Sequence, residues 1–184
     1  MSSEPVQQER LPKITVMLHW VLASSVLFLF VSSWWMLSLP LPSAEFTYRV
    51  LPFQLHKNIG MTLLLITVAM AAIRIANSSN RRLHNPSRMQ KLAALDHLIM
   101  YLLLAACCLS GYFSSSYSGW ETSFWWVLNL PAWAEENDDL NILFSGLHLW
   151  SCWALLAVIT LHIGAAIYHA IADDGLINKM FRLD

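Results

Sequence analysis

The stretch that decides the fold is LHLWSCWALLAVITLHIGAAIYH, residues 147–169. It contains no Lys, Arg, Asp or Glu, and it exceeds the roughly 20 apolar residues that a helix needs to cross a bilayer. It nevertheless carries His148 and His162, and such side chains are costly at membrane depth unless they face a bundle interior. The stretch therefore predicts a transmembrane helix whose histidines point toward other parts of the protein.

Three further stretches are long and apolar enough to cross a membrane, at residues 15–39, 53–76 and 92–112. The stretch quoted above is part of a fourth span over residues 140–172. The 184-residue chain is 57% hydrophobic and 12% charged, whereas soluble domains carry roughly 25% charged residues. The run at 15–39 is longer than a signal-peptide core and no A-x-A site follows it, so we expect it to remain as a helix. The sequence therefore predicts an all-α fold, a single integral membrane four-helix bundle over residues 1–184.

The loops differ in charge. Residues 77–91 carry four basic residues and no acid, whereas residues 114–141 carry five acids and no Lys or Arg. Basic loops favour the cytoplasmic side, so we expect both termini in the cytoplasm and the protein in a bacterial inner (plasma) membrane. Within the acidic loop, GWETSFWWVLNLPAW at residues 119–133 is typical of a short amphipathic outer segment that lies on the membrane surface.

Four histidines match one another in depth. His19 and His162 lie at the cytoplasmic level of the first and fourth spans, and His56 and His148 lie at the outer level of the second and fourth. His148 and His162 are fourteen residues apart, which returns to within about 40° of the same helix face, roughly 21 Å along the axis. Histidine is the usual axial ligand of haem iron. The pattern predicts two non-covalent b-type haems, with the pairs His19/His162 and His56/His148 as axial ligands.

Two cations accompany these histidines. Arg74 follows His56 by eighteen residues, which is five full turns, so it shares that face at the cytoplasmic level. It is placed either to pair with propionates of the inner haem or to snorkel to lipid head groups. Lys57 is placed to meet outer-haem propionates or to steer an anion, and a solvated interfacial lysine is the alternative.

The remaining histidines leave the inner pair open. His97 lies early in the third span, and His169 lies near the end of the fourth. Either could replace a member of the inner pair. Otherwise each is a polar neighbour of the propionates or of quinone, or has a structural role. The depth match favours His162 over His169, and His84 lies in the basic loop, where we expect it to be solvated. Small residues near the ligands permit either a flat macrocycle or plain helix packing, and they are Gly60, Gly146 and Gly164.

The cysteines form no CxxC or CxxCH motif, so covalent c-type haem and zinc-ribbon chemistry are unsupported. They fall inside apolar runs, and we expect them to behave as small buried hydrophobic residues. They are Cys107, Cys108 and Cys152.

An ordered set of segments resembles the bacterial cytochrome b561 family of four-helix, di-haem membrane proteins. The segments are MLHW (17–20), LHKNIGMTLLLITVAMAAIRI (55–75), DHLIMYLLLAACCLSGY (96–112) and LHLWSCWALLAVITLHIGAAIYHAIADDGLINKM (147–180). The resemblance implies axial ligation by His19, His56, His148 and His162. It also implies quinone as a redox partner and, in some members, oxidation of superoxide at the outer face.

Two positions depart from the family pattern. Cys108 stands where the family often has Pro, shortly before the Gly-Tyr of the third span. The final basic run is thin, because Asp173 and Asp174 precede Lys179 and Arg182. Neither departure touches the expected haem ligands.

Three functions follow from these patterns. The first is an electron carrier, a quinone-linked oxidoreductase with an outer-face donor such as superoxide. The alternative is a haem-carrying membrane anchor of a larger dehydrogenase or hydrogenase, with the Trp-rich acidic loop as its docking surface. The third is a metal or proton pathway, which predicts further acids along one track, yet Asp96, at a span edge, is the only acid in a span. No phosphate loop, dinucleotide fingerprint or basic nucleic-acid groove is present in the sequence.

Overall fold

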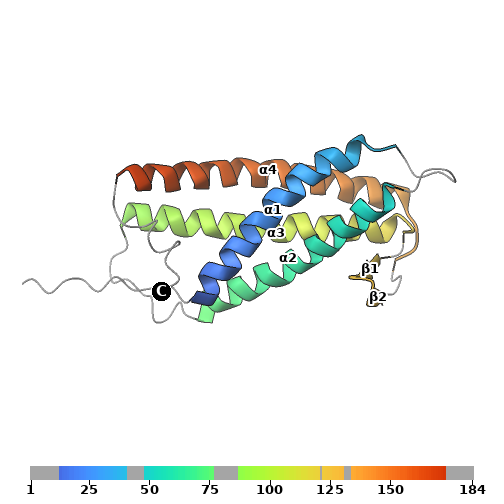
Figure 1. Ribbon diagram of the computed structural model, residues 1–184, viewed down its shortest axis with the longest axis horizontal. Coiled ribbons are helices and arrows are strands. Elements are labelled where there is room, and N and C mark those ends of the chain that lie inside the picture. Colours follow the sequence, from blue (N-terminus) through green and yellow to red (C-terminus); the bar gives the residue numbers. More distant parts are fainter. Residues whose placement is uncertain (1–12, 41–47, 77–86, 121, 131–133, 173–184) are drawn as a thin grey trace, which may run out of the picture.

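The computed structural model describes residues 13–40, 48–76, 87–120, 122–130 and 134–172. It contains the helices α1 (Lys13–Ser38), α2 (Val50–Ala76), α3 (Arg88–Tyr117) and α4 (Asp138–Ile171), and the short strands β1 (Thr122–Phe124) and β2 (Leu128–Leu130) (Figure 1). All four helices are long and apolar enough to cross a membrane. The predicted four-helix membrane fold is therefore confirmed. His84 and both terminal segments lie outside the described residues.

The helices exceed the predicted spans most clearly at α3. Its start is fixed by a capping box, in which the Ser87 side chain accepts from the Gln90 N–H and the Gln90 side chain accepts from the Ser87 N–H. Its end lies at Tyr117, beyond the glycine and serines that suggested an earlier stop. Gly111 abuts α4 at this point, and Ser116 donates its hydroxyl to a carbonyl one turn earlier. Packing on α4 keeps the segment helical, and the hydroxyl bond satisfies Ser116 within the helix.

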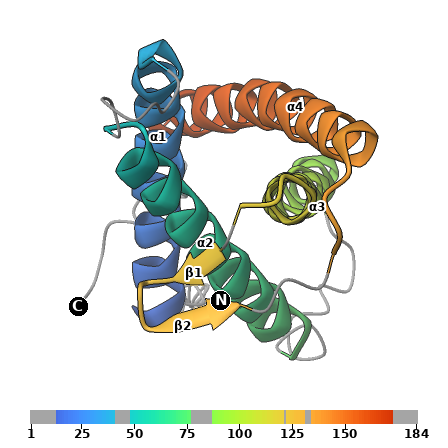
Figure 2. The same ribbon diagram turned by 90° about the vertical axis from the view of Figure 1, so that its right-hand side faces the viewer.

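The four helices form a bundle in which α4 packs closely on α3 but only sparsely on α1 and α2. α3 and α4 form the most extensive helix pair, and α2 packs against both α1 and α3. Among the described residues, α1 and α2 make at most sparse contacts with α4, which Figure 2 shows beside α3. Large apolar side chains point outward from every helix, as expected for a lipid-facing surface, including Leu27, Leu65, Leu102 and Leu161.

An apolar layer divides the interior at mid-height. Leu155 lies seven residues from both His148 and His162, so each histidine is roughly 10 Å from it along the axis of α4. The layer is made of one buried residue from each helix: Val26, Leu63, Leu104 and Leu155. The bundle therefore has two polar levels that an apolar layer separates.

The predicted amphipathic outer segment contains a β-hairpin, because β1 and β2 pair antiparallel with Thr122 opposite Leu130. This adds a small β element to the all-α bundle, and the hairpin lies beside α2 (Figure 2). The Trp125 backbone N–H donates to Asn58 Oδ1, and its indole Nε1–H donates to Thr62 Oγ1, each at 3.0 Å. These bonds attach the hairpin to α2.

The tip of the hairpin is conformationally unusual. Trp125 and Trp126 have φ angles of 48° and 57°, a left-handed region that bulky residues rarely adopt. The two hydrogen bonds of Trp125 to α2 offset the cost of this conformation at Trp125. Val127, next along the tip, is 90% exposed. The tip thus presents apolar side chains away from the bundle.

Candidate functional site

The outer level brings His56 of α2 and His148 of α4 together, with ring centroids 6.1 Å apart and ring planes at 80°. A metal–imidazole bond is about 2 Å long, so two rings that share one metal ion have centroids roughly 6 Å apart. The observed spacing fits an axial pair, although α2 and α4 scarcely touch. The predicted outer pair is thus brought together across an open space.

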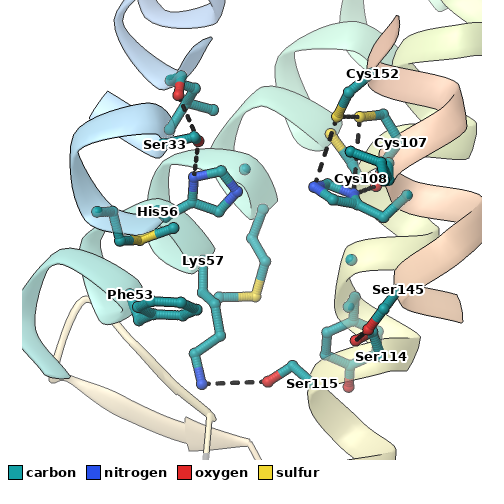
Figure 3. Close-up of a pocket in the computed structure, with 18 of the residues that line it drawn as sticks. Ser33, Phe53, His56, Lys57, Cys107, Cys108, Ser114, Ser115, Ser145 and Cys152 are labelled. Carbon is teal, nitrogen blue, oxygen red and sulfur yellow. Dashed lines mark hydrogen bonds between the residues drawn. The ribbon is translucent and has the colours of Figure 1, made fainter. Parts of the chain in front are cut away.

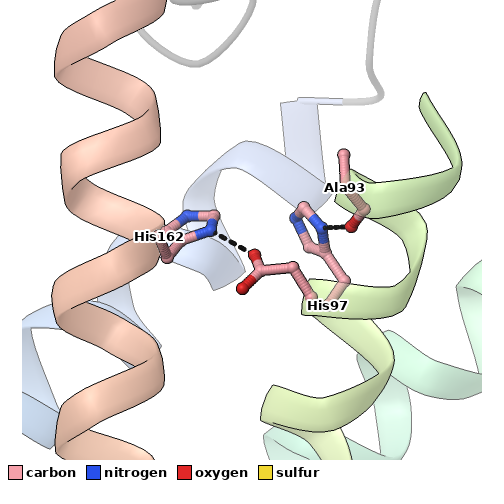
Figure 4. A network of polar contacts seen from close by, with 4 residues as sticks. Ala93, His97 and His162 are labelled. Carbon is pink, nitrogen blue, oxygen red and sulfur yellow. Dashed lines mark hydrogen bonds and ion pairs between the residues drawn. The ribbon is translucent and has the colours of Figure 1, made fainter. Parts of the chain in front are cut away.

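The inner level brings three histidines together. The ring centroids of His19 and His162 are 6.4 Å apart with planes at 52°, which again fits a shared metal ion. His97 of α3 meets His162 edge-on at 5.4 Å (Figure 4), and its Nδ1–H donates to the Ala93 carbonyl at 2.6 Å. His169, in the last turn of α4, has its ring 5.6 Å from that of Tyr168. His97 is therefore the histidine that shares this level with the predicted pair.

Two of the predicted ligands on α4 are oriented by α3. His162 Nδ1 lies 2.7 Å from the Asp96 carboxylate (Figure 4), and His148 Nδ1 lies 2.7 Å from the Cys107 carbonyl oxygen. A carbonyl or carboxylate oxygen accepts, so Nδ1 carries the proton in both rings. The lone pair of each Nε2 is then available for a metal, and the bond at Nδ1 holds the ring in place.

The same logic applies to His56. Its Nδ1 lies 3.2 Å from Ser33 Oγ, and that hydroxyl lies 2.6 Å from the Leu29 carbonyl oxygen. Because the Ser33 proton is donated to the carbonyl, its oxygen accepts from His56 Nδ1–H. In three of the four predicted ligands Nδ1 is therefore hydrogen-bonded, which leaves Nε2 as the nitrogen for a metal, and His148 Nε2 lies 3.7 Å from Cys152 Sγ.

A cavity of about 610 Å³ adjoins the outer histidine pair, and most of its lining is apolar. Cofactor sites commonly measure about 300–1,000 Å³. Gly60, one turn after His56, lines this cavity, and a Cβ added to it would meet no atom of the described chain within 4 Å. Close helix packing therefore does not account for Gly60, whereas an open wall beside a flat ligand does.

Gly111 has a different role. A Cβ added there would lie 3.0 Å from His148 Nδ1 and 3.1 Å from its Cε1. The missing side chain makes room for the ring of His148 beside α3. A Cβ at Gly146 or Gly164 would meet no described atom within 4 Å, so contact with other helices does not require those glycines.

The structure places the two predicted cations at the expected levels. Lys57 lines the outer cavity, and its Nζ donates to Ser115 Oγ at 3.2 Å (Figure 3). Arg74 lies close enough to His97 to interact with it electrostatically, which puts it at the inner level. Lys57 is thus half-buried in the cavity wall, and pairing of either cation with propionates stays a prediction.

Several contacts of the ligands were not predicted. Asp96, Ser33 and the Cys107 carbonyl each bond the Nδ1 of a different predicted ligand. For Asp96 a signal was available, because it is the one acid within a predicted span and an acid at that depth needs a partner. Ser33 and a backbone carbonyl carry no comparable signal.

Comparison with known proteins gives matches over almost the whole chain. Residues 10–183 match the family described as prokaryotic cytochrome b561. The chain is 30% identical over 174 residues to cytochrome b561 homolog 2 of Escherichia coli (strain K12), covering 94% of this chain and 91% of that protein. It is 27% identical over 179 residues to cytochrome b561 homolog 1 of the same organism, covering 93% and 96% of the two chains.

Proposed function

This chain belongs to the prokaryotic cytochrome b561 family and is a membrane-embedded haem b electron-transfer protein; on that premise we propose that it holds two haems and connects an outer-face donor to quinone. The observation that carries the proposal is the pair of histidine contacts at two levels, with ring centroids 6.1 and 6.4 Å apart. A b-type haem supplies one-electron chemistry at its iron. Superoxide is the proposed donor.

The proposed ligands are His56 and His148 for the outer haem and His19 and His162 for the inner haem. The Nδ1 bonds of His56, His148 and His162 support this assignment, because they leave Nε2 free and fix the ring planes. The sparse contacts of α4 with α1 and α2 support it as well. The cavity beside His56 and His148 fits a planar cofactor.

The residues around the proposed haem sites would bind the cofactors and keep water away from them. Lys57 in the outer cavity and Arg74 at the inner level are positioned for carboxylate groups of the cofactors. The apolar layer around Leu155 keeps water from the space between the two levels. A low-dielectric interior of this kind confines electron transfer to the cofactors rather than to solvent.

The proposed location is the bacterial inner membrane, with both termini in the cytoplasm. At the end of the bundle where α3 begins, the described residues include Arg88 and Lys91, whereas Asp138 and Asp139 begin α4 at the other end. This difference supports the orientation through the preference of basic residues for the cytoplasmic side.

An anchor subunit is the alternative function. Its support is the hairpin tip, where Trp126 is 55% and Val127 90% exposed. A docked dehydrogenase or hydrogenase would deliver electrons from that side. Purification from native membranes in mild detergent separates the two functions, because a stoichiometric second subunit would support the anchor.

The central test is the haem content of purified protein by pyridine haemochrome assay. We expect two b haems per chain and loss of one haem in each of the four variants with Ala at His19, His56, His148 or His162. The variants His97→Ala and His169→Ala are matched controls and should keep both haems. A folded protein without haem would refute the proposal, and loss at His97 instead of His19 would reassign the inner pair.

With haem content established, the donor is tested by rapid mixing. Superoxide should reduce the oxidised protein in proteoliposomes that contain quinone, and Lys57→Gln should slow the reaction if Lys57 steers the anion. Reduction by quinol but not by superoxide would remove the proposed donor and keep the haem assignment.

A further inference from the structure

Two cysteines from neighbouring helices meet beside the outer histidine pair. Cys107 Sγ of α3 and Cys152 Sγ of α4 lie 2.9 Å apart, and both are free thiols in the structure. Figure 3 shows them together on one side of the cavity, across from His56. We propose that Cys107 and Cys152 are a modification site, a dithiol that a small disulfide converts into a reversible bond between α3 and α4.

The geometry needs little change to form this bond. A disulfide is about 2.05 Å long, so the two sulfur atoms must approach by roughly 0.9 Å, which is within reach of side-chain rotation. The backbones are already held together, because His148 Nδ1–H bonds the Cys107 carbonyl and α3 packs more extensively on α4 than on any other helix. The helices therefore need not move.

The pair also touches a proposed haem ligand. Cys107 Sγ lies 3.8 Å from His148 Nδ1, and Cys152 Sγ lies 3.7 Å from His148 Nε2. A bond between the two sulfur atoms would link α3 to α4 next to this ring. The inference goes beyond electron transfer, because the thiols and their reaction require no haem.

The reaction is an ordinary thiol–disulfide exchange. One protein thiol attacks a sulfur of the small disulfide, forms a mixed disulfide and releases one small thiol. The second protein thiol then attacks the protein sulfur of that mixed disulfide and releases the second small thiol. The two cysteine sulfurs are oxidised, the small disulfide is reduced to two thiols, and the thiol protons are carried away by these products.

Position and access support the reaction. Both cysteines line the outer cavity, which extends to Ser118 and Trp120 at the end of α3. A small disulfide therefore reaches them through this cavity before the outer haem fills it. In the proposed orientation this end faces the periplasm, where disulfides persist. Cys108 lines the same cavity and also packs against the central apolar layer, so the test removes its thiol by substitution.

The test uses full-length protein in detergent after haem extraction, so that the outer cavity is open, and 2,2′-dithiodipyridine, a small apolar disulfide. In Cys108→Ser protein, we expect release of two thiopyridone molecules per chain and a protein mass lower by two hydrogen atoms, with no retained adduct. Dithiothreitol should restore both thiols. The double variants Cys108→Ser/Cys107→Ser and Cys108→Ser/Cys152→Ser have one thiol each, so any reaction should leave a stable adduct.

Three results would overturn the inference. They are stable adducts on both thiols of the Cys108→Ser protein, failure of its native thiols to react although the unfolded protein reacts fully, and a tightly held zinc ion that is lost in the Cys152 variant. The last result would reassign Cys107, His148 and Cys152 to a metal site. Haem content is measured in parallel, and its loss would not alter the thiol count, so the two proposals fail separately.

Discussion

Each proposed ligand on α4 is held by a different kind of acceptor. His162 bonds the Asp96 carboxylate, whereas His148 bonds the backbone carbonyl of Cys107. A carboxylate makes the imidazole a stronger electron donor than a carbonyl does, and this favours the oxidised metal. The residues themselves therefore make the two levels electrostatically unequal.

Replacing Asp96 tests this difference. Asp96→Asn keeps an acceptor for His162 Nδ1 but removes the negative charge, so the midpoint potential of the inner haem should rise by about 60 mV, a tenfold change for a one-electron couple. Spectroelectrochemical titration measures both haems at once, and the outer haem is the internal reference. Asp96→Ala should instead lower inner-haem affinity by about 10–100-fold. Equal shifts at both haems would contradict the assignment.

Substitution of Gly111 tests whether the position of the His148 ring matters for the outer haem. In Gly111→Ala protein the new methyl group would lie 3.0 Å from His148 Nδ1, so the ring should be displaced and overpacking should cost about 1–3 kcal/mol. We expect weaker binding and an altered spectrum of the outer haem alone. Gly146→Ala, where a Cβ meets no described atom within 4 Å, is the matched control and should bind both haems normally. An unchanged outer haem in Gly111→Ala protein would show that His148 is not its ligand.

At the scale of elements, the hairpin depends on α2. Its tip residue Trp125 adopts a left-handed conformation and bonds α2 through both its backbone and its indole. Two strands of three residues are too short to be stable alone. The sequence 119–133 therefore takes its shape from the helix that it contacts.

A double-mutant cycle between Trp125 and Thr62 measures this attachment. Trp125→Phe removes the indole donor, Thr62→Val removes the acceptor, and the pair should show a coupling energy of about 0.5–1.5 kcal/mol. Stability is followed by denaturant unfolding in detergent, and haem content should not change because the indole contacts no proposed ligand. A coupling energy near zero would mean that the hairpin does not dock through this bond.

At the scale of the molecule, the bundle is closed where it needs no cofactor and open where cofactors are proposed. α3 and α4 pack extensively, whereas α4 meets α1 and α2 at the central apolar layer and across the two histidine levels. The haems would then complete the contacts between α4 and the first two helices. Folding and haem binding are expected to be coupled.

Removal of haem tests this coupling. Binding at a thousand times Kd stabilises a protein by about 4 kcal/mol per site, so haem-free protein should unfold at a clearly lower temperature. Hydrogen exchange should increase most in α1 and α2, which would meet α4 through the haems, and least along the interface of α3 with α4. Identical melting of haem-free and haem-loaded protein would show that the bundle is complete without its cofactors.

Hydropathy and spacing determined much of this protein because they are local properties of the chain. Four apolar runs separated by polar loops allow little besides four membrane helices, and His148 and His162 share a face because helical periodicity carries one position to the other. Gly111 and the serines after it misled the prediction of the end of α3, because packing on α4 and bonds to preceding carbonyls override a weak local preference.

The tertiary structure decided the contacts that depend on how each helix is rotated and tilted against its neighbours. The bonds from Asp96 to His162 and from Ser33 to His56 join residues on different helices, as does the meeting of Cys107 with Cys152. Sequence periodicity gives the relative directions of side chains on one helix only, whereas a hydrogen bond between helices requires donor and acceptor within about 3 Å. The levels of the histidines could therefore be predicted from the sequence, but the groups that hold their rings could not.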